Sequence, residues 1–313
     1  MVAAAAARGA IFAGRPAFEP LVLARLPGAR YLTAARTRRL ALARELRALE
    51  PGAALLLPDS FSSALVAALA GIPRRIGYGA EGRGFLLTVR VPRAGRARSA
   101  PRAAEYRVLG EAAGLSVPPG EPSLAAAEGE RALGMARLEA AGIGDGPVLV
   151  LAPGAAYGPA KQWGPERFAA VGAHVARSRG AALAIVGAGG DAGPAGETAR
   201  LAAAAGARVA NLAGATSIPE LVGILDAALA VVSNDSGVMH LAAALGRPTV
   251  GIFGSTSPVW TASAAPWATS LYAEYPCSPC FRRTCPIGYG CLRSIEAEQG
   301  TKAVERLLGK ERE

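Results

Sequence analysis

Short strand-like and helix-like segments alternate through the second half of the chain. The segments with strand character are 148–153, 181–189, 229–233 and 248–253. The segments with helical spacing of apolar residues are 165–179, 192–205, 218–228 and 238–245. Strands that alternate with helices form parallel sheets, because neighbouring parallel strands need a crossover connection that a helix supplies. The pattern predicts an α/β fold with a doubly wound parallel sheet.

The first half repeats this alternation on a smaller scale. Helices are expected over 36–50 and 64–71, and strands over 53–58 and 72–79. Residues 116–147 carry the Pro and Gly punctuation of a connector around one helix, and an apolar strand begins directly after them. We therefore place a domain boundary near residue 143, which gives an amino-terminal domain of residues 1–142 and a carboxyl-terminal domain of residues 143–313.

A polar turn lies between two apolar runs in the stretch "SNDSGVMHLAAALGRPTVGIFG", residues 233–254. Its residues Asn234, Asp235, Ser236 and Gly237 follow an expected strand and precede or begin an expected helix. Ligands of open parallel sheets bind beyond the carboxyl ends of the strands. The N-terminus of a helix also offers free N–H groups and a partial positive charge, which suit a phosphate. This turn is therefore the first candidate for a binding site.

The charge of the chain indicates anionic partners. Lys and Arg number 34 against 24 Asp and Glu, which gives a net charge of +10. The alternative is that the many Arg and Ala codons reflect a GC-rich genome. No dense Lys/Arg run with interleaved aromatic residues occurs, so we expect no nucleic-acid partner. No run of 18 apolar residues without a charge occurs either, so we expect no transmembrane helix.

Lysine is rare in this background and occurs only at positions 161, 302 and 310. Lys161 lies in a Gly/Pro-rich loop after the expected strand 148–153, where an ammonium group could reach a phosphate or a sugar hydroxyl. An ordinary surface lysine is the alternative. The segment "VGAGGD", residues 186–191, is similar to a phosphate-binding loop, but glycines of a tight turn explain it equally well.

Four segments follow one another in the order of a known family. They read "LLLPDSFSSALVAALAGIPRRIGYGAEGRGFLL", "PGAAYGPAKQW", "NLAGATSIPELVGILDAALAVVSNDSGVMHLAAALGRPTVGIFG" and "CSPCFRRTCPIGYGCL". Together they resemble the ADP-heptose:lipopolysaccharide heptosyltransferases of glycosyltransferase family 9, in particular the heptosyltransferase II type. The resemblance extends from about residue 20 to about residue 310. It implies a GT-B fold, in which two Rossmann-like domains face a cleft and the second domain holds most of the nucleotide sugar.

The resemblance also assigns roles to the two loops. Lys161 and Asp235 would be the catalytic residues, and the donor-binding residues would be Tyr157, Ser236, Gly237, Met239 and His240. Asp235 would bond heptose hydroxyls, while His240 would face the phosphates unless it is a packed helix histidine. The sequence contains no Asp-X-Asp metal motif. We therefore expect Lys161 and the helix N-terminus to neutralise the departing ADP, with no cofactor required for catalysis.

Sugar transfer with inversion needs one carboxylate as general base. The resemblance predicts this base in a Gly-Asp pair after the family's first strand, but no Asp precedes Asp59. Met1 aligns with the family's second strand, so a unit of about 30 residues is expected upstream. We favour a gene start assigned too far downstream over a truncated chain or one that no longer catalyses.

Three carboxylates elsewhere in the first half of the chain are possible substitutes for that base. Glu81 lies on a glycine-rich loop and is the better substitute, with a contact to the acceptor as its first expected role. Glu105 lies beside Tyr106 at the start of an expected helix. Asp59 is expected to cap the helix that follows it, because Asp is a favoured N-cap residue.

The four cysteines form one cluster with the spacing C-x2-C-x4-C-x5-C: Cys277, Cys280, Cys285 and Cys291. In a cytosolic protein such a cluster more often binds a metal than forms disulfides. We expect a structural zinc ion here, with an iron–sulfur cluster as the lesser alternative, because four thiolates would close the coordination shell. Free, redox-labile thiols in a loop are the other alternative.

These inferences predict a cytoplasmic enzyme that works at the periphery of the inner membrane in lipopolysaccharide inner-core biosynthesis. The resemblance implies transfer of L-glycero-D-manno-heptose from ADP-heptose to heptosyl-Kdo2-lipid A. The basic surface would then hold the phosphorylated glycolipid acceptor and the acidic leaflet. The alternatives are a family 9 transferase with another core-sugar acceptor, and a protein that binds a nucleotide sugar without catalysis.

Overall fold

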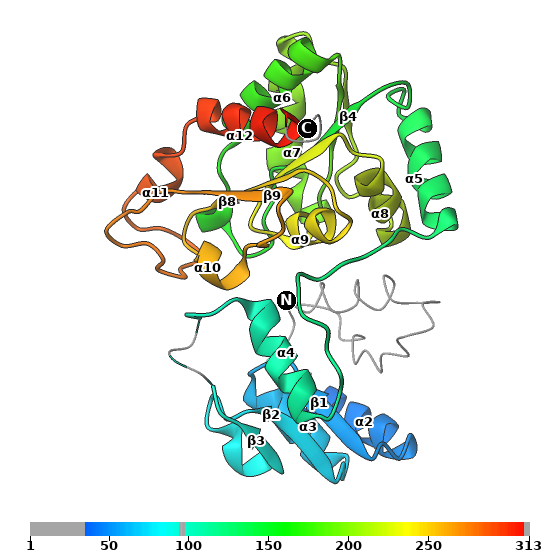
Figure 1. The fold of residues 1–313 in the computed structure, drawn as a ribbon, viewed down its shortest axis with the longest axis vertical. Coiled ribbons are helices and arrows are strands. Elements are labelled where there is room, and N and C mark those ends of the chain that lie inside the picture. Colours follow the sequence, from blue (N-terminus) through cyan, green and yellow to red (C-terminus); the bar gives the residue numbers. More distant parts are fainter. Residues whose placement is uncertain (1–34, 94, 96–97, 310–313) are drawn as a thin grey trace. The chain divides into compact units, whose positions relative to one another are not determined.

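The computed structural model describes residues 35–309 except residues 94, 96 and 97. The chain divides into two compact units between Gly120 and Glu121. We call residues 35–120 the amino-side unit and residues 121–309 the carboxyl-side unit, and describe each by itself (Figure 1). Residues 1–34, at which the sequence analysis expects the family's first strand–helix unit to be absent, lie outside the described residues.

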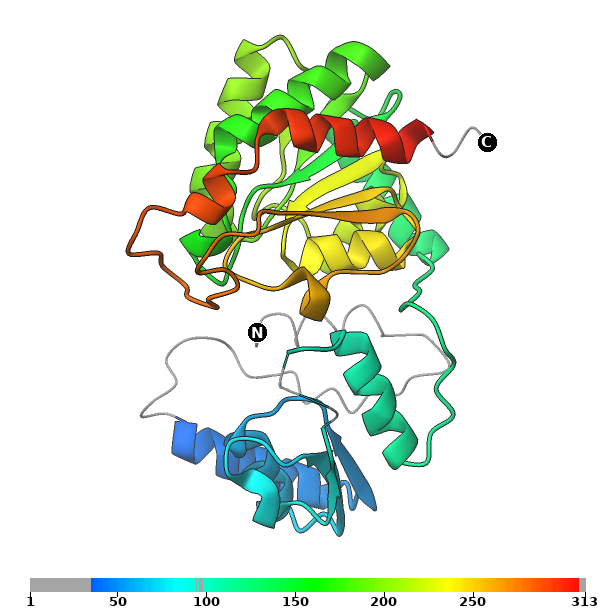
Figure 2. The ribbon, with the colours of Figure 1, turned by 60° about the vertical axis from the view of Figure 1, so that its left-hand side comes forward.

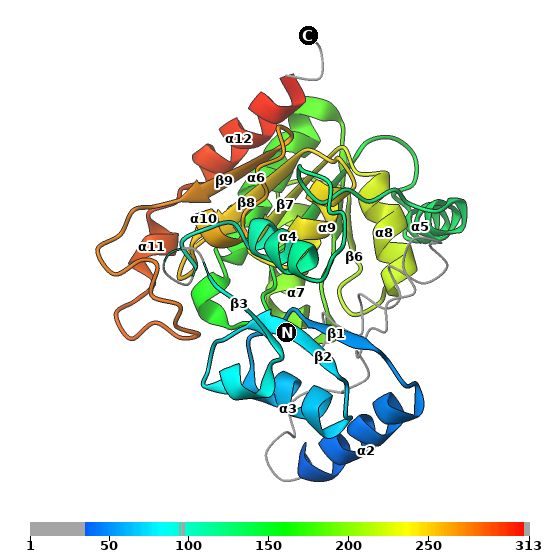
Figure 3. The ribbon, with the colours of Figure 1, turned by 60° about the horizontal axis from the view of Figure 1, so that its bottom comes forward.

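The amino-side unit holds a three-stranded parallel sheet in the order β1-β2-β3. Its elements are α2 (Ala35–Ala48), β1 (Ala53–Leu56), α3 (Phe61–Leu69), β2 (Arg74–Tyr78), the short helix η1 (Arg83–Leu86), β3 (Val89–Val91) and α4 (Arg102–Ala112). Residues of α2 and α3 pack in one apolar cluster with Leu56 of β1. On the other face, Leu109 of α4 packs against Ile76 and Val91. Figure 3 shows α2 and α3 side by side.

The carboxyl-side unit holds a six-stranded sheet in the order β6-β5-β4-β7-β8-β9, and all its strands are parallel. Its strands are β4 (Val148–Ala152), β5 (Ala182–Ile185), β6 (Val209–Asn211), β7 (Ala230–Asn234), β8 (Thr249–Phe253) and β9 (Ala268–Tyr272). Its helices are α5 (Glu128–Ala140), η2 (Pro159–Lys161), α6 (Pro165–Arg179), η3 (Gly189–Asp191), α7 (Ala192–Ala204), α8 (Ile218–Asp226), α9 (Gly237–Ala244), α10 (Pro258–Thr261), α11 (Gly290–Arg293) and α12 (Ala297–Gly309).

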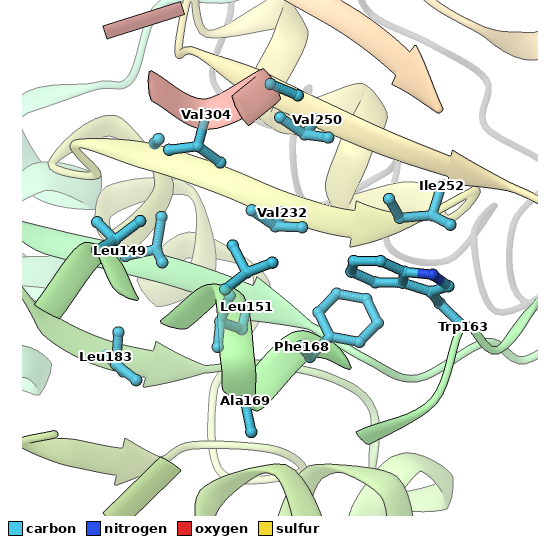
Figure 4. Close-up of a cluster of buried hydrophobic side chains, with 14 of the residues drawn as sticks. Leu149, Leu151, Trp163, Phe168, Ala169, Leu183, Val232, Val250, Ile252 and Val304 are labelled. Carbon is cyan, nitrogen blue, oxygen red and sulfur yellow. The ribbon is translucent and has the colours of Figure 1, made fainter. Parts of the chain in front are cut away.

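Alternate residues of each central strand serve two separate cores, because successive side chains point to opposite faces of a sheet. Leu149 and Leu151 of β4 pack with residues of α6, α7 and α12 (Figure 4). Val148 and Val150 of the same strand pack with residues of α5, α8 and α9. Figure 2 shows α12, in red, lying across one face of this sheet. The expected doubly wound architecture is therefore confirmed.

Helix α5 belongs to the carboxyl-side unit, whereas the sequence analysis placed a boundary after it, near residue 143. It crosses α8 where two glycines meet, and a Cβ on Gly134 would lie only 2.3 Å from the carbonyl carbon of Gly223. Arg131 also forms an ion pair with Asp226 of α8 at 2.9 Å. A contact between glycine backbones leaves no apolar pattern in the sequence. For this reason the Pro/Gly punctuation of residues 116–147 indicated an interdomain connector around this helix.

None of the helices in the described part of the chain is long and apolar enough to cross a membrane.

Candidate functional site

Two loops meet at the carboxyl end of the larger sheet. Strands β4 and β7 are paired neighbours, so the loop after β4, which carries Lys161, lies beside the loop after β7, which carries Asp235. The ammonium nitrogen Nζ of Lys161 lies 2.6 Å from Oδ2 of Asp235. It also donates a hydrogen bond to the backbone carbonyl of Asp235 at 3.2 Å. The structure therefore brings together the two residues that the sequence analysis named as catalytic.

The carboxylate of Asp235 is buried, with 3% of its side chain exposed. The hydroxyl of Thr256 donates to its Oδ2 at 2.7 Å, and the hydroxyl of Thr261 approaches its Oδ1 at 3.4 Å. His240 is half exposed, and its Nε2 lies 4.0 Å from the same Oδ1. A carboxylate with this many donors holds one fixed orientation, so Asp235 presents a defined acceptor to a ligand.

Asn234 ties the two loops together, a role that the sequence analysis did not assign. It is fully buried, and its amide nitrogen donates to the carbonyls of Pro153 at 2.7 Å and Gly154 at 3.2 Å. Its Oδ1 accepts the backbone N–H of Trp163 at 3.1 Å. Because these partners flank Lys161 on both sides, Asn234 fixes the lysine loop against β7. The sequence signal for such a role is an Asn that directly follows an apolar strand, because a polar side chain buried there needs hydrogen-bond partners.

The N-terminus of α9 is open. Ser236 occupies the N-cap position, but its hydroxyl pairs with the hydroxyl of Ser233 at 2.9 Å and makes no side-chain cap bond. Gly237 is exposed, and a Cβ there would meet no atom within 4 Å. The first N–H groups of a helix have no intrahelical acceptor, so this end of α9 can receive an anion.

The side chain of Met239, a residue expected to bind the donor, lies in the core. Its side chain is 3% exposed and packs under α9, where a Cβ on Gly251 would lie 2.4 Å from the Met239 sulfur. The side chain is thus part of the core between α9 and β8. A contact between Met239 and a donor would have to come from its backbone N–H in the first turn of the helix.

Tyr157 lies in the lysine loop, residues 153–164 between β4 and α6, and contacts the Cys-rich loop, residues 277–291. Nζ of Lys161 is 4.9 Å from the centroid of its ring, which is within the range of a cation–π contact. Its hydroxyl donates a hydrogen bond to the backbone carbonyl of Phe281. The guanidinium carbon of Arg283 lies 5.4 Å from the same ring centroid. Tyr157 therefore has cations as neighbours, as expected of a residue near a phosphate group.

The glycine-rich segment 186–191 is a structural turn. The carboxylate of Asp191 accepts the backbone N–H of Ala188 at 2.9 Å. The same side chain fills the space beside Gly154, where a Cβ would lie 2.1 Å from its carboxyl carbon. The chain's own carboxylate thus accepts an N–H group of this turn and fills the space beside Gly154, which favours the tight-turn interpretation of these glycines.

The four cysteines are free, and they range from exposed (Cys277) to buried (Cys291). The backbone N–H of Tyr289 donates to Sγ of Cys285 at 3.3 Å. Hydrogen bonds from the backbone of Tyr289 and then Ile287 lower the pKa of the Cys285 thiol, while burial raises the pKa of Cys291. In the described ranges no three Cys, His, Asp or Glu side chains are arranged to hold a metal ion.

In the amino-side unit, Asp59 does not cap α3, so that prediction is wrong. The N-cap residue is Ser60, whose hydroxyl accepts the backbone N–H of Ser63 at 3.4 Å. Asp59 instead pairs through Oδ2 with Arg93 at 2.8 Å and Arg102 at 3.3 Å. The arginines come from later in the chain, so a tertiary ion pair replaces the local cap that the sequence suggested.

These contacts decide the protonation of Asp59. Burial raises its pKa, but the hydrogen bond from Arg93 and the charges of Arg102 and Arg93 outweigh burial and hold the pKa below its ordinary value. A carboxylate with a lowered pKa is a weak base. Asp59 is therefore poorly suited to take a proton from a sugar hydroxyl.

The other two carboxylates differ in exposure. Glu105 is buried in the same cluster, where it pairs with Arg93 at 3.2 Å and Arg102 at 2.9 Å. Glu81 is exposed, has a positive φ of 48°, and accepts the backbone N–H of Phe61 at 3.4 Å. Of the three, Glu81 alone is exposed and forms no ion pair with an arginine among the described residues, so it stays the candidate for acceptor contact.

Comparison of the sequence with known proteins identifies relatives of this chain. The sequence profile of glycosyltransferase family 9 (heptosyltransferase) matches residues 39–289. The chain is 34% identical over 227 residues to lipooligosaccharide heptosyltransferase 2 of Haemophilus influenzae, which covers 70% of this chain and 64% of that protein. It is 35% identical over 215 residues to lipopolysaccharide heptosyltransferase 2 of Escherichia coli, with coverage of 66% and 61%. The chain thus spans less than two thirds of the length of these curated relatives.

A solved structure agrees with the sequence matches. The structure of Escherichia coli ADP-heptose lps heptosyltransferase II superposes with a TM-score of 0.71 at 29% sequence identity. The superposition covers 89% of this chain and 82% of that chain.

Proposed function

The chain belongs to glycosyltransferase family 9, and from this premise we propose that it transfers L-glycero-D-manno-heptose from ADP-heptose to heptosyl-Kdo2-lipid A, with inversion. The observation that carries the proposal is the buried pair of Lys161 and Asp235, 2.6 Å apart beside the open N-terminus of α9. The relatives named above are heptosyltransferases of type 2. A related family 9 reaction with another core-sugar acceptor is the alternative within this class.

The residues of the site have distinct tasks in this proposal. The open N–H groups of α9 and the Lys161 amine stabilise the negative charge that develops on ADP as the glycosidic bond breaks. Asp235, fixed by Thr256 and Lys161, accepts hydrogen bonds from heptose hydroxyls. His240, half exposed on the same turn of α9, faces the phosphates. The contacts described above orient Lys161 and Asp235.

The described residues contain no carboxylate that is clearly suited to act as the general base. Asp59 has a lowered pKa, and Glu105 is buried among arginines. Glu81 is the remaining substitute, with a first role in contact with the acceptor. A protein that binds the nucleotide sugar without turnover is the alternative that this observation favours.

Lys161→Ala is expected to weaken ADP binding by about 1.5 to 3 kcal/mol, the range for a hydrogen bond to a charged group. Isothermal calorimetry measures the change, and Lys302→Ala is the matched control, because Lys302 is three-quarters exposed on α12. Unchanged ADP affinity in Lys161→Ala would contradict the role of this residue.

Transfer of radiolabelled heptose from ADP-heptose to purified heptosyl-Kdo2-lipid A tests the proposed reaction itself. We expect product that depends on both substrates. Tight ADP-heptose binding without product would instead select the binding protein, and product only with a different acceptor would select the related transferase.

We also propose that the protein works in the cytoplasm at the periphery of the inner membrane, where its glycolipid acceptor lies. The support is a pair of exposed aromatic rings in the amino-side unit, Phe61 and Phe85, with centroids 6.0 Å apart. The guanidinium of Arg90, an exposed residue, lies beside Gly84, the residue before Phe85, since a Cβ on Gly84 would be 2.7 Å from it. Aromatic and basic side chains together suit an anionic lipid surface. Sedimentation with anionic but not with neutral vesicles is the expected result.

For the cysteines we propose a structural zinc ion that catalysis does not require. The support is their clustering within one short stretch of sequence and the backbone N–H groups that bond Cys285 and favour its thiolate form. Because the four thiols of the described loop are not arranged around one point, zinc binding would have to draw this loop together. About one equivalent of zinc is expected in freshly purified protein by elemental analysis, and less in Cys285→Ser. A metal content near zero, together with four titratable thiols, would contradict this proposal.

A further inference from the structure

The nucleotide-sugar site proposed above is short of net positive charge. Lys161 is its obvious cation, but Asp235 lies 2.6 Å from it and both side chains are largely buried, so the pair has almost no net charge. The N-terminus of α9 contributes about half an elementary charge. A nucleoside diphosphate carries at least one negative charge on each phosphate. A further cation close to Lys161 would therefore improve the electrostatic match.

The Cys-rich loop supplies such a cation in Arg283. Its guanidinium carbon lies 5.4 Å from the centroid of the Tyr157 ring, and Nζ of Lys161 lies 4.9 Å from the same centroid. The two charged groups are consequently within about 10 Å of each other. That separation is comparable to the Debye length at moderate salt, about 8 to 10 Å, so an anion near Lys161 feels the charge of Arg283.

The backbone of Arg283 is fixed against the lysine loop. Its carbonyl accepts the N–H of Ala160, the residue before Lys161, at 3.0 Å. Gly158 makes this approach possible, because it has a φ of 138° and a Cβ there would lie 2.7 Å from that carbonyl oxygen. A residue with a side chain at position 158 would force the two loops apart. Arg283 is thus held beside Lys161 by contacts that do not involve its own charge.

Among the described residues, the one contact of the Arg283 guanidinium is the ring of Tyr157. Arg283 is exposed, and no acidic side chain in the described ranges forms an ion pair with it. By contrast, Arg93 and Arg102 in the amino-side unit are each committed to Asp59 and Glu105. Two cations near one aromatic ring repel each other, and an anion bound near both would remove that repulsion.

We propose that Arg283 is a further donor-binding residue, whose guanidinium binds a phosphate oxygen of the nucleoside diphosphate. This inference rests on the proposed function, because it adds a residue to the same site. Lys161 then serves two partners, Asp235 and the diphosphate, and Arg283 supplies the positive charge that Asp235 cancels. Arginine suits this place because its planar donors can bind two phosphate oxygens at once.

The test compares ADP with adenosine in calorimetric titrations of three proteins: wild type, Arg283→Ala and Arg282→Ala. Arg282 is the matched control, since it is the neighbouring exposed arginine of the same loop. We expect Arg283→Ala to bind ADP about tenfold more weakly, the effect of one charged hydrogen bond, and to bind adenosine as the wild type does. Arg282→Ala is expected to bind both ligands like the wild type, and Arg283→Lys to recover part of the loss.

The possible results of these titrations distinguish a failure of the Arg283 proposal from a failure of the proposed function. Wild-type protein that binds ADP, with Arg283→Ala unchanged, would overturn the role of Arg283 and leave the proposed function intact. Equal losses in Arg282→Ala and Arg283→Ala would also overturn it, because the effect would then be one of loop charge in general. Wild-type protein that binds no adenine nucleotide would overturn both proposals.

Discussion

Asp235→Asn is expected to lower the free energy of unfolding of the carboxyl-side unit by about 3 to 5 kcal/mol, the usual cost of removing one partner from a buried ion pair. The substitution keeps the shape of the side chain but leaves the ammonium of Lys161, 14% exposed, without its counterion. It also removes the charge from the acceptor of the Thr256 hydroxyl. Urea unfolding followed by tryptophan fluorescence measures the change, because all three Trp residues, at 163, 260 and 267, lie in this unit.

A second ion pair of the same chemistry provides the control. Lys302 and Glu298 on α12 are 2.7 Å apart but about three-quarters exposed, so Glu298→Gln is expected to leave the unfolding curve unchanged. The double variant Lys161→Met/Asp235→Asn is expected to be more stable than the sum of the two single losses predicts, since neither charge is left alone. Additive losses in this cycle would mean that the pair is not coupled and that another contact explains the effect of Asp235→Asn.

The periodicity of the sequence predicted the carboxyl-side sheet well, because its signal is local. The helix expected over 165–179 begins and ends at Pro165 and Arg179, where a Pro at the first position and a Gly after the last provide clear boundaries. The turn at 233–237 could be identified as a site for a similar reason. A polar turn between two apolar segments can only lie at the end of a strand, and the parallel topology then places it beside the loop of Lys161.

The contacts that the sequence did not predict are all tertiary. Asp59 was assigned to a helix cap because that contact needs only neighbours in the sequence, whereas its actual partners Arg93 and Arg102 are 34 and 43 residues away. Arg283 could not be recognised as a neighbour of Lys161, because it is one of many arginines and its position depends on the packing of the Cys-rich loop against Gly158. Met239 was named as a donor-binding residue, and only the fold shows that its side chain fills the space over Gly251.

The sequence also did not show that α5 belongs to the carboxyl-side unit, because its contact with α8 is tertiary. This contact leads to a prediction of large effect. Gly134→Ala is expected to destabilise the carboxyl-side unit by about 3 kcal/mol, because the new methyl group would lie 2.3 Å from the carbonyl carbon of Gly223 and 2.4 Å from the nitrogen of Ile224. Both are backbone atoms, so no side chain can move aside and the two helices must separate. For a unit of this size, the loss corresponds to a fall of about 6 to 12 °C in the thermal midpoint measured by tryptophan fluorescence.

Gly129→Ala on the same helix separates this close contact from the general effect of replacing glycine. Position 129 is exposed, and a Cβ there would meet no atom within 4 Å. Alanine favours helix over glycine by roughly 0.5 to 1 kcal/mol, so Gly129→Ala is expected to raise the midpoint slightly. If Gly134→Ala also raised the midpoint, α5 would not pack on α8 through its glycines. The division of the chain between Gly120 and Glu121 would then lose its physical basis, and a boundary near residue 143 would be the better description.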